Sequence, residues 1–374
     1  MQVRSGREAM QVVRAPLFAR PRGGGGDGAR VLPASLAAQR LNRTSPWRVL
    51  AIVVVAGAAG TVLLSGVNLF TWALVWIYAL FALSTNVLFG WTGRASFGQA
   101  AFFGIGAYLV SFDPIKSWAG PFSVLAAGAA AGVAALAVSL ITRRSSGLSF
   151  AILTLIVGQV LYEVVDLTGS LGGETGLYGI SAGNIGPVNV GANYRTFAFY
   201  TVVIVGICVV ALSWLQSSYL GLSMTGVRDS ARRSSSLGIP VARIHAIAFG
   251  VAGCFAGIAG ALFAQQQTTV SSSLLNWSFS GDVVVMCLVG GMYSFWGPVL
   301  GAALYTWLTT VGFAGSANAN LYLGIVLLIV VLVFPGGIAG IGTLLRDSPR
   351  LRARIRLPAR VADSTSGPAE GGLS

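Results

Sequence analysis

The sequence predicts an all-α integral membrane protein, a polytopic bundle of about 8 to 10 transmembrane helices. Hydrophobic residues make up 55% of the 374-residue chain and charged residues only 9%, with a mean hydropathy of +0.76, whereas roughly 25% of an ordinary soluble domain is charged. Apolar runs of the length needed to cross a bilayer, about 20 residues, follow one another through most of the chain. These runs lack the alternation of barrel strands, so helices are the expected way to satisfy the backbone.

Both ends of the chain are basic and polar. Residues 1–47 are rich in Arg, Gly and Pro and poor in acids, so we expect a disordered cytoplasmic tail there. No apolar run follows the early arginines until residue 49, which argues against a signal peptide; an organelle transit peptide or a start site assigned too far upstream are the alternatives. Residues 342–374 form a second basic cytoplasmic tail, and residues 48–341 form the transmembrane domain.

Single crossings are expected first within this domain. They cover about residues 49–65, 68–90, 96–112, 121–142, 148–166, 197–216 and 246–267.

A broken apolar stretch at 281–311 follows the single crossings, and a last span covers 320–341. Gly290-Gly291 and Gly297-Pro298 interrupt the broken stretch, and such residues are tolerated at membrane depth where protein buries the freed backbone. It therefore forms a broken or re-entrant helical pair, either two crossing helices or a hairpin that turns within the membrane. The short arms favour the hairpin.

The basic residues predict an orientation. If the N-terminus lies inside the cell, every Lys and Arg falls on the inner side except Lys116 and Arg195, as the positive-inside tendency requires. Both termini are then cytoplasmic. The net charge of +13 follows from this placement, and we expect no nucleic acid partner.

Segments 167–196 and 217–245 are the long connections between spans. The first lies outside in this topology and is able to meet a soluble partner. The second is the largest inner loop and is amphipathic enough for a short helix.

The sequence pattern argues against an enzyme. Cys208, Cys254 and Cys287 stand inside apolar runs without metal-ligand spacing, so we interpret them as packing residues. The single histidine, His245, stands where the inner loop enters a span, where a hydrogen-bonding role is more common than general base catalysis. Neither a metal-ligand cluster nor a nucleophile elbow with its partners is apparent. We predict no enzymatic activity and no cofactor.

The segment GWTGRASFGQAAFFGIGAY, residues 90–108, spaces small residues three and four apart. Such spacing lets helix backbones approach closely in membranes, and helix–helix contact is the simpler interpretation. The alternative is that Gln99 and the glycine-rich backbone line a polar pathway, because irregular backbone at membrane depth usually borders a cavity.

This segment also resembles a signature of the permeases of high-affinity branched-chain amino acid ABC transporters. Similar matches follow in the family's order at residues 149–177, 237–264, 288–304 and 331–341. Together they cover roughly residues 68–341. The resemblance implies a transmembrane permease subunit in the bacterial cytoplasmic membrane, which moves leucine, isoleucine or valine by alternating access. Related permeases carry urea, short amides or other amino acids, so the solute stays open.

The resemblance also implies several partners. These are a second permease subunit, identical or different, two cytoplasmic ATP-binding subunits and an extracytoplasmic solute-binding protein, all in or at the lipid bilayer. The segment 226–240 resembles the coupling segment that docks on the ATPase. Its candidate residues are Arg228, Asp229, Arg232, Arg233, Gly238 and Pro240.

The coupling segment departs from the family at residues 230–236. It reads SARRSSS, where the family usually has an acidic residue followed by paired alanines. A solvated basic loop is the alternative interpretation. The only lysine, Lys116, is not part of a phosphate-binding G-x-x-x-x-G-K-[ST] loop, so ATP hydrolysis is expected on another polypeptide.

Polar residues inside spans are the candidates for the solute pathway. Glu163 and Asp166 stand three apart on one helical face and either bind the ammonium of an amino acid or cap the helix at the interface. Uncharged candidates are Asn86, Gln99, Thr154 and Gln159. A self-sufficient channel or ion-coupled transporter, the other functional class, would need more ionisable residues deep in the membrane than this sequence offers.

Overall fold

The computed structural model describes most of the chain between residues 46 and 339. The described residues are 46–64, 66–112, 115, 120–173, 175–181, 183–185, 188–191, 193–312, 319–333 and 337–339. The predicted tails, 1–47 and 342–374, lie outside these residues except for Pro46 and Trp47. Lys116 also lies outside the described residues.

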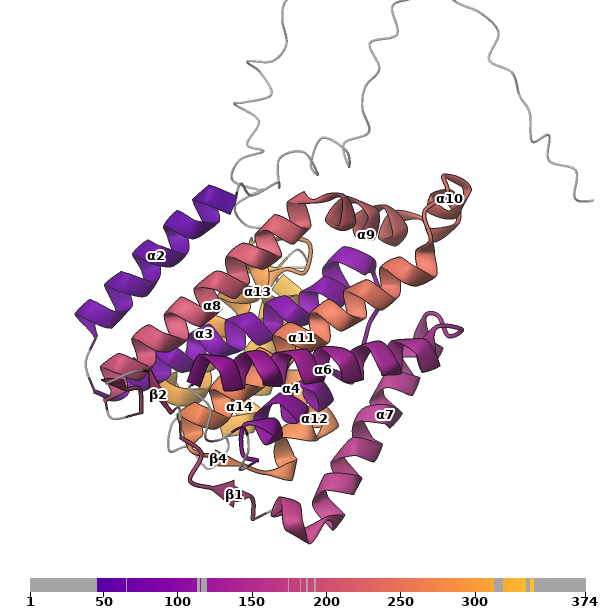
Figure 1. Cartoon of the computed structure of the whole chain (residues 1–374). Helices are drawn as coiled ribbons and strands as arrows, with labels where there is room; N and C mark the ends of the chain where they lie inside the picture. Colours follow the sequence, from indigo (N-terminus) through magenta and orange to yellow (C-terminus); the bar gives the residue numbers. More distant parts are fainter. Residues whose placement is uncertain are drawn as a thin grey trace, which may run out of the picture. The chain divides into compact units, whose positions relative to one another are not determined.

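The described chain is an all-α helical bundle, as predicted (Figure 1). Its α-helices are α2 Pro46–Leu63, α3 Val67–Asn86, α4 Gln99–Leu109, α6 Gly120–Thr142, α7 Leu148–Leu167, α8 Tyr194–Ser217, α9 Tyr219–Asp229, α10 Ala231–Ser236, α11 Val241–Gln267, α12 Trp277–Gly290, α13 Gly297–Trp307 and α14 Ala319–Val333. Short π or 3-10 segments are η1 Val87–Trp91, η2 Gly169–Leu171, η3 Ser272–Leu275 and η4 Leu308–Gly312.

Six of the described helices are long and apolar enough to cross a membrane: α2, α3 with η1, α6, α7, α8 and α11. They match the predicted single crossings to within a few residues, because a bilayer sets the length of an apolar run. Among them, α3 and α11 are mostly buried in protein, whereas α2 and α7 are mostly exposed. Mostly exposed apolar helices are expected to face lipid or another subunit.

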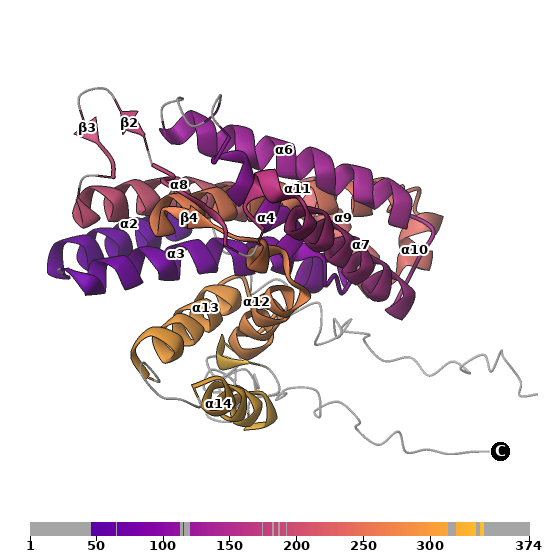
Figure 2. The same ribbon diagram turned by 90° about the horizontal axis from the view of Figure 1, so that it is seen from below.

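Close packing of small residues holds α11 at the centre of the bundle, between α6, α4 and α3 (Figures 1 and 2). A Cβ atom at Gly260 would collide with the carbonyl oxygen of Phe103, and one at Gly106 would collide with the backbone of Gly257. Small residues allow this approach where no hydrophobic drive exists between helices. The helix–helix interpretation of the segment 90–108 is confirmed for its α4 part.

The predicted crossing at 96–112 is shorter in the structure. The helix α4 has only 11 residues, and the chain from Gly93 to Gly98 is not helical. The backbone N–H of Phe97 donates to Thr154 Oγ1, a residue inside α7, at 3.2 Å, so α4 begins within the bundle. Gly93, with φ +70°, supplies the left-handed turn that this entry requires.

The connections at the end of the bundle opposite α9 form two small antiparallel pairs. β1 Leu177–Tyr178 pairs with β4 Thr269–Val270, and β2 Asn184–Ile185 pairs with β3 Val188–Asn189. The loop predicted at 167–196 is therefore partly ordered onto the end of α11. The inner loop predicted at 217–245 folds into α9 and α10, and α11 begins at Val241 rather than at 246.

The broken stretch predicted at 281–311 is the antiparallel pair α12 and α13, which lies on one side of α3 together with α14 (Figure 2). Glycines let the pair close tightly, since a Cβ at Gly290 would collide with Gly297 and one at Gly301 with Met286. The turn between the helices contacts α9, because Tyr293 lies under the guanidinium of Arg228. The turn therefore lies at the α9 end of the bundle, and the choice between a hairpin within the membrane and two crossing helices stays a prediction.

Candidate functional site

An exposed tip follows α9 at one end of the bundle. The short helix α10 begins at Ser230, whose hydroxyl accepts a hydrogen bond from the Arg233 backbone N–H at 3.3 Å. Arg232, Arg233 and Leu237 are exposed, Leu237 by 81%. These residues give the tip one exposed apolar side chain beside two exposed arginines.

The turn after α10 shapes the rest of this tip. Gly238 takes a left-handed φ of +81°, which a side chain would strain, and the exposed Pro240 precedes α11. These two residues shape the turn that joins α10 to α11, directly after Leu237. The predicted coupling residues thus share one exposed tip, except for Arg228 and Asp229, which lie at its base.

Arg228 joins the base of the tip to the interior of the bundle. Its Nη1 donates to the carbonyl oxygen of Gly90 at 2.6 Å, its Nε and Nη2 donate to Asp229 Oδ1 at 3.2 and 3.1 Å, and its guanidinium carbon lies 5.5 Å from the centroid of the Tyr293 ring. The side chain is only 20% exposed. Arg228 therefore connects α9 to η1, which continues α3, and to the α12–α13 turn.

The broken backbone between α3 and α4 carries two of the predicted pathway residues. Asn86 and Gln99 are fully or almost fully buried, and the polar atoms of both side-chain amides have no hydrogen-bond partner among the described residues. Buried amides without partners are rare in proteins. Thr154 differs, because its hydroxyl donates to Ala151 O and accepts from Phe97 N–H, so it clamps the start of α4 to α7.

The remaining predicted pathway residues lie elsewhere on α7. Gln159 Nε2 donates to Glu163 Oε1 at 3.3 Å, and both residues border an open groove of about 350 Å³ on the exposed face of this helix. The buried face of α7, which includes Thr154 and Gly158, is a different one. The structure therefore does not bring the five candidates into one group.

Asp166 does not act together with Glu163. Its Oδ1 accepts a hydrogen bond from the Ser272 hydroxyl at 2.7 Å, and the Ser272 backbone N–H donates to Gly173 O. Asp166 thus ties the end of α7 to η3, and the interfacial interpretation stays a prediction.

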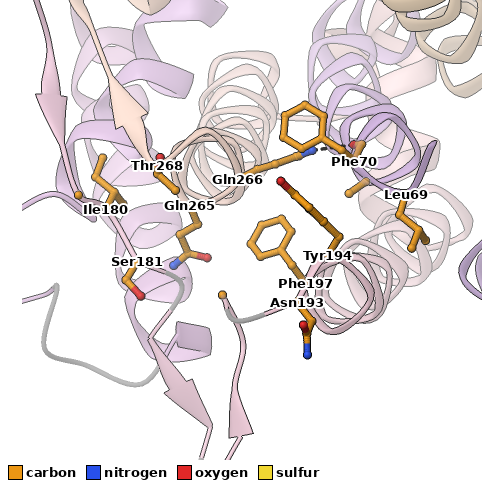
Figure 3. Close-up of a pocket in the computed structure, with 13 residues that line it drawn as sticks. Leu69, Phe70, Ile180, Ser181, Asn193, Tyr194, Phe197, Gln265, Gln266 and Thr268 are labelled. Atoms are coloured by element: carbon orange, nitrogen blue, oxygen red, sulfur yellow. Dashed lines mark hydrogen bonds between the residues drawn. The ribbon is translucent and has the colours of Figure 1, made fainter. Parts of the chain in front are cut away.

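A pocket of about 730 Å³ opens at the end of the bundle opposite α9 (Figure 3). It lies between the ends of α3, α8 and α11 and is lined by amides, hydroxyls and aromatic rings; its described lining includes no charged side chain. Gln265 donates to Ser123 Oγ and accepts from the Tyr200 hydroxyl, while Gln266 donates to Phe70 O at 2.7 Å. Sequence reasoning missed this pocket, although consecutive glutamines at the end of an apolar span are a signal.

One protein-family profile matches most of this chain. The family described as "Branched-chain amino acid transport system / permease component" matches residues 67–334. The chain belongs to this family. The match covers every long helix except α2, together with the tip, the broken backbone and the α12–α13 pair.

The names of the curated relatives agree with this family. Over 252 residues the permease is 27% identical to the "High-affinity branched-chain amino acid transport system permease protein LivM" of Salmonella typhimurium, covering 61% of this chain and 59% of the relative. The Escherichia coli protein of the same name is 27% identical over 255 residues, 62% of this chain and 60% of the relative. The permease thus spans about 60% of the length of these relatives. No solved structure matches it.

Sequence reasoning also missed an ionisable residue of the permease, Asp282. This half-buried residue lies in α12, and the side chain of Tyr305 in α13 lies beside it. The broken stretch was expected to begin at residue 281, which placed Asp282 at the edge of the stretch and not inside a helix. The helix begins at Trp277, which places the carboxylate inside it.

Proposed function

We propose that this permease is the solute-conducting subunit of an ATP-driven importer of branched-chain amino acids. The observation that carries the proposal is the exposed tip around Leu237, joined through Arg228 to two interior elements. We expect such a surface to bind a partner subunit and to transmit the partner's movement to the membrane helices. The names of the curated relatives support the amino acid solute.

The assembly we propose has ATP-binding subunits on the α9 side and a solute-binding protein on the side of the Gln265 pocket. Both chain termini are then cytoplasmic. A second permease subunit, of the same or a different sequence, covers the exposed face of α7. Glu163 supports this placement, because an ionised carboxylate facing lipid is costly, whereas one facing a pathway between subunits is not.

The mechanism we propose is alternating access without covalent chemistry. ATP binding moves the tip, and Arg228 passes this movement to Gly90 at the end of α3 and to the turn before α13. The chain from Gly93 to Gly98 lies outside the helices, so it is the segment best able to change shape. Asn86 and Gln99, at either side of it, then supply hydrogen bonds to the solute.

A second candidate is an importer of a different small polar solute. One relative, from Shigella flexneri, is named "Autoinducer 2 import system permease protein LsrC" and is 29% identical over 142 residues, 35% of this chain and 40% of the relative. The uncharged lining of the outer pocket suits an uncharged polar solute as well as an amino acid.

Purification from the native membrane tests the assembly. We expect ATP-binding subunits to co-purify with the permease, and their ATP hydrolysis to rise when the cognate solute-binding protein is added with leucine. A rise with another solute and none with leucine supports the second candidate. A permease that purifies without ATP-binding subunits and still conducts solute contradicts both.

A further inference from the structure

Asp282 lies near the middle of the membrane-spanning part of the permease. Phe279, three residues earlier on α12, has its ring 6.2 Å from that of Tyr78, which is close to the centre of the segment Val67–Trp91 formed by α3 and η1. Ser280, two residues before Asp282 in α12, accepts a hydrogen bond from the Ala100 backbone N–H at 2.9 Å, and Ala100 is at the buried start of α4. Transporters bind their solutes at this depth, beside discontinuous helices.

No basic side chain of the four helices around this carboxylate balances it, because the described residues of α3, α12, α13 and α14 include no Lys, Arg or His. Tyr305 lies beside Asp282 but carries no positive charge. Because ionisable groups inside a membrane are expensive and are usually paired, a cationic group of the solute is a suitable partner for this carboxylate.

Aromatic rings from three helices gather beside Asp282. The rings of Tyr78 and Tyr305 lie 6.4 Å apart at 88°, and those of Tyr78 and Phe279 lie 6.2 Å apart. Phe279 is three residues before Asp282 on α12 and therefore shares its face. Rings in such a cluster attract cations through their faces, and the neighbouring position Gly281 borders open space.

We propose that Asp282, Tyr305, Tyr78 and Phe279 form the site that binds the primary ammonium group of the solute halfway through the membrane. The inference rests on the proposed import of amino acids. Asp282 forms the ion pair, Tyr305 holds its carboxylate in place, and the rings of Tyr78 and Phe279 cover the ammonium and the first carbons of an apolar side chain.

Leucine uptake by proteoliposomes that contain the complete transporter tests the site. We expect Asp282→Asn to lower the initial rate about tenfold or more, the fold-change that loss of a charge-assisted contact produces, and Asp282→Glu to keep most of it. Asp166→Asn is the matched control and should stay within about twofold of the original, since Asp166 only holds the outer connection. Wild-type uptake by a folded Asp282→Asn variant overturns the proposal, because a protonated or merely structural carboxylate is well replaced by an amide.

The ring contacts give an independent test if Asp282→Asn fails to fold. Tyr78→Phe keeps the ring and should transport leucine, whereas Tyr78→Leu should not; equal uptake by both variants overturns the proposal. Isopentylamine, which has the ammonium and branched chain of leucine without its carboxylate, should inhibit uptake more strongly than 4-methylpentanoate, which has only the carboxylate. The reverse order contradicts an ammonium site. If the wild-type transporter shows no ATP-dependent leucine uptake, the proposed function itself is wrong.

Discussion

Replacement of Arg228 by glutamine should separate ATP hydrolysis from transport. The change removes the charge-assisted hydrogen bond to Gly90 O at 2.6 Å, worth about 1.5–3 kcal/mol, and the contact with the Tyr293 ring, worth about 0.5–1 kcal/mol. The pair with Asp229, which is 45% exposed, is worth about 0–1 kcal/mol because solvent screens it, and it is left out of the sum because Asp229 neighbours Arg228 and does not belong to the interior. The link between the tip and the interior thus loses about 2–4 kcal/mol, roughly a 30- to 900-fold change in its equilibrium.

The assay is leucine uptake per ATP hydrolysed by the reconstituted transporter. We expect this ratio to fall by about tenfold or more in Arg228→Gln, while ATP hydrolysis continues, because the docking tip is unchanged. Arg195→Gln, a change at an exposed arginine at the start of α8, is the matched control and should leave the ratio unaltered. An unaltered ratio in Arg228→Gln would refute the role of Arg228 in coupling.

The other predictions concern the tip around Leu237, the helix packing at Gly260 and the turn between α12 and α13. Leu237→Glu should prevent co-purification of the ATP-binding subunits, and retention of these subunits would exclude the tip as the docking surface. Gly260→Ala should cost about 1–3 kcal/mol, because the added Cβ meets Phe103 O, and should lower the unfolding temperature in detergent, whereas Gly324→Ala, with open space around it, should not. Ser294→Cys should react with an impermeant maleimide from the cytoplasmic side; reaction only from outside would contradict two crossing helices.

The sequence predicted the long spans well because bilayer thickness alone fixes their length. The runs that became α6, α7 and α8 needed no tertiary information. In contrast, α4 was predicted too long, since nothing in the apolar run 96–112 shows that Thr154 captures the backbone of Phe97. The α12–α13 pair was predicted as a broken helical pair, but only the structure shows that its turn lies beside α9, through the contact between Tyr293 and Arg228.

The candidate site was predicted only in part. Asn86 and Gln99 were chosen as polar residues in apolar surroundings, and both are buried without partners. Their function stays a prediction, as does that of Gln159 and Glu163. Asp282 was missed because a residue's depth depends on where its helix begins, and its importance comes from a contact with Tyr305 on a different helix.

ATP-dependent leucine uptake tests the central claim most directly. Proteoliposomes that contain this permease with its second permease, ATP-binding subunits and solute-binding protein should accumulate leucine when ATP is supplied to the ATP-binding side, with or without an ion gradient. Omission of the ATP-binding subunits should abolish the uptake. Uptake that an ion gradient drives when those subunits are absent would contradict the account.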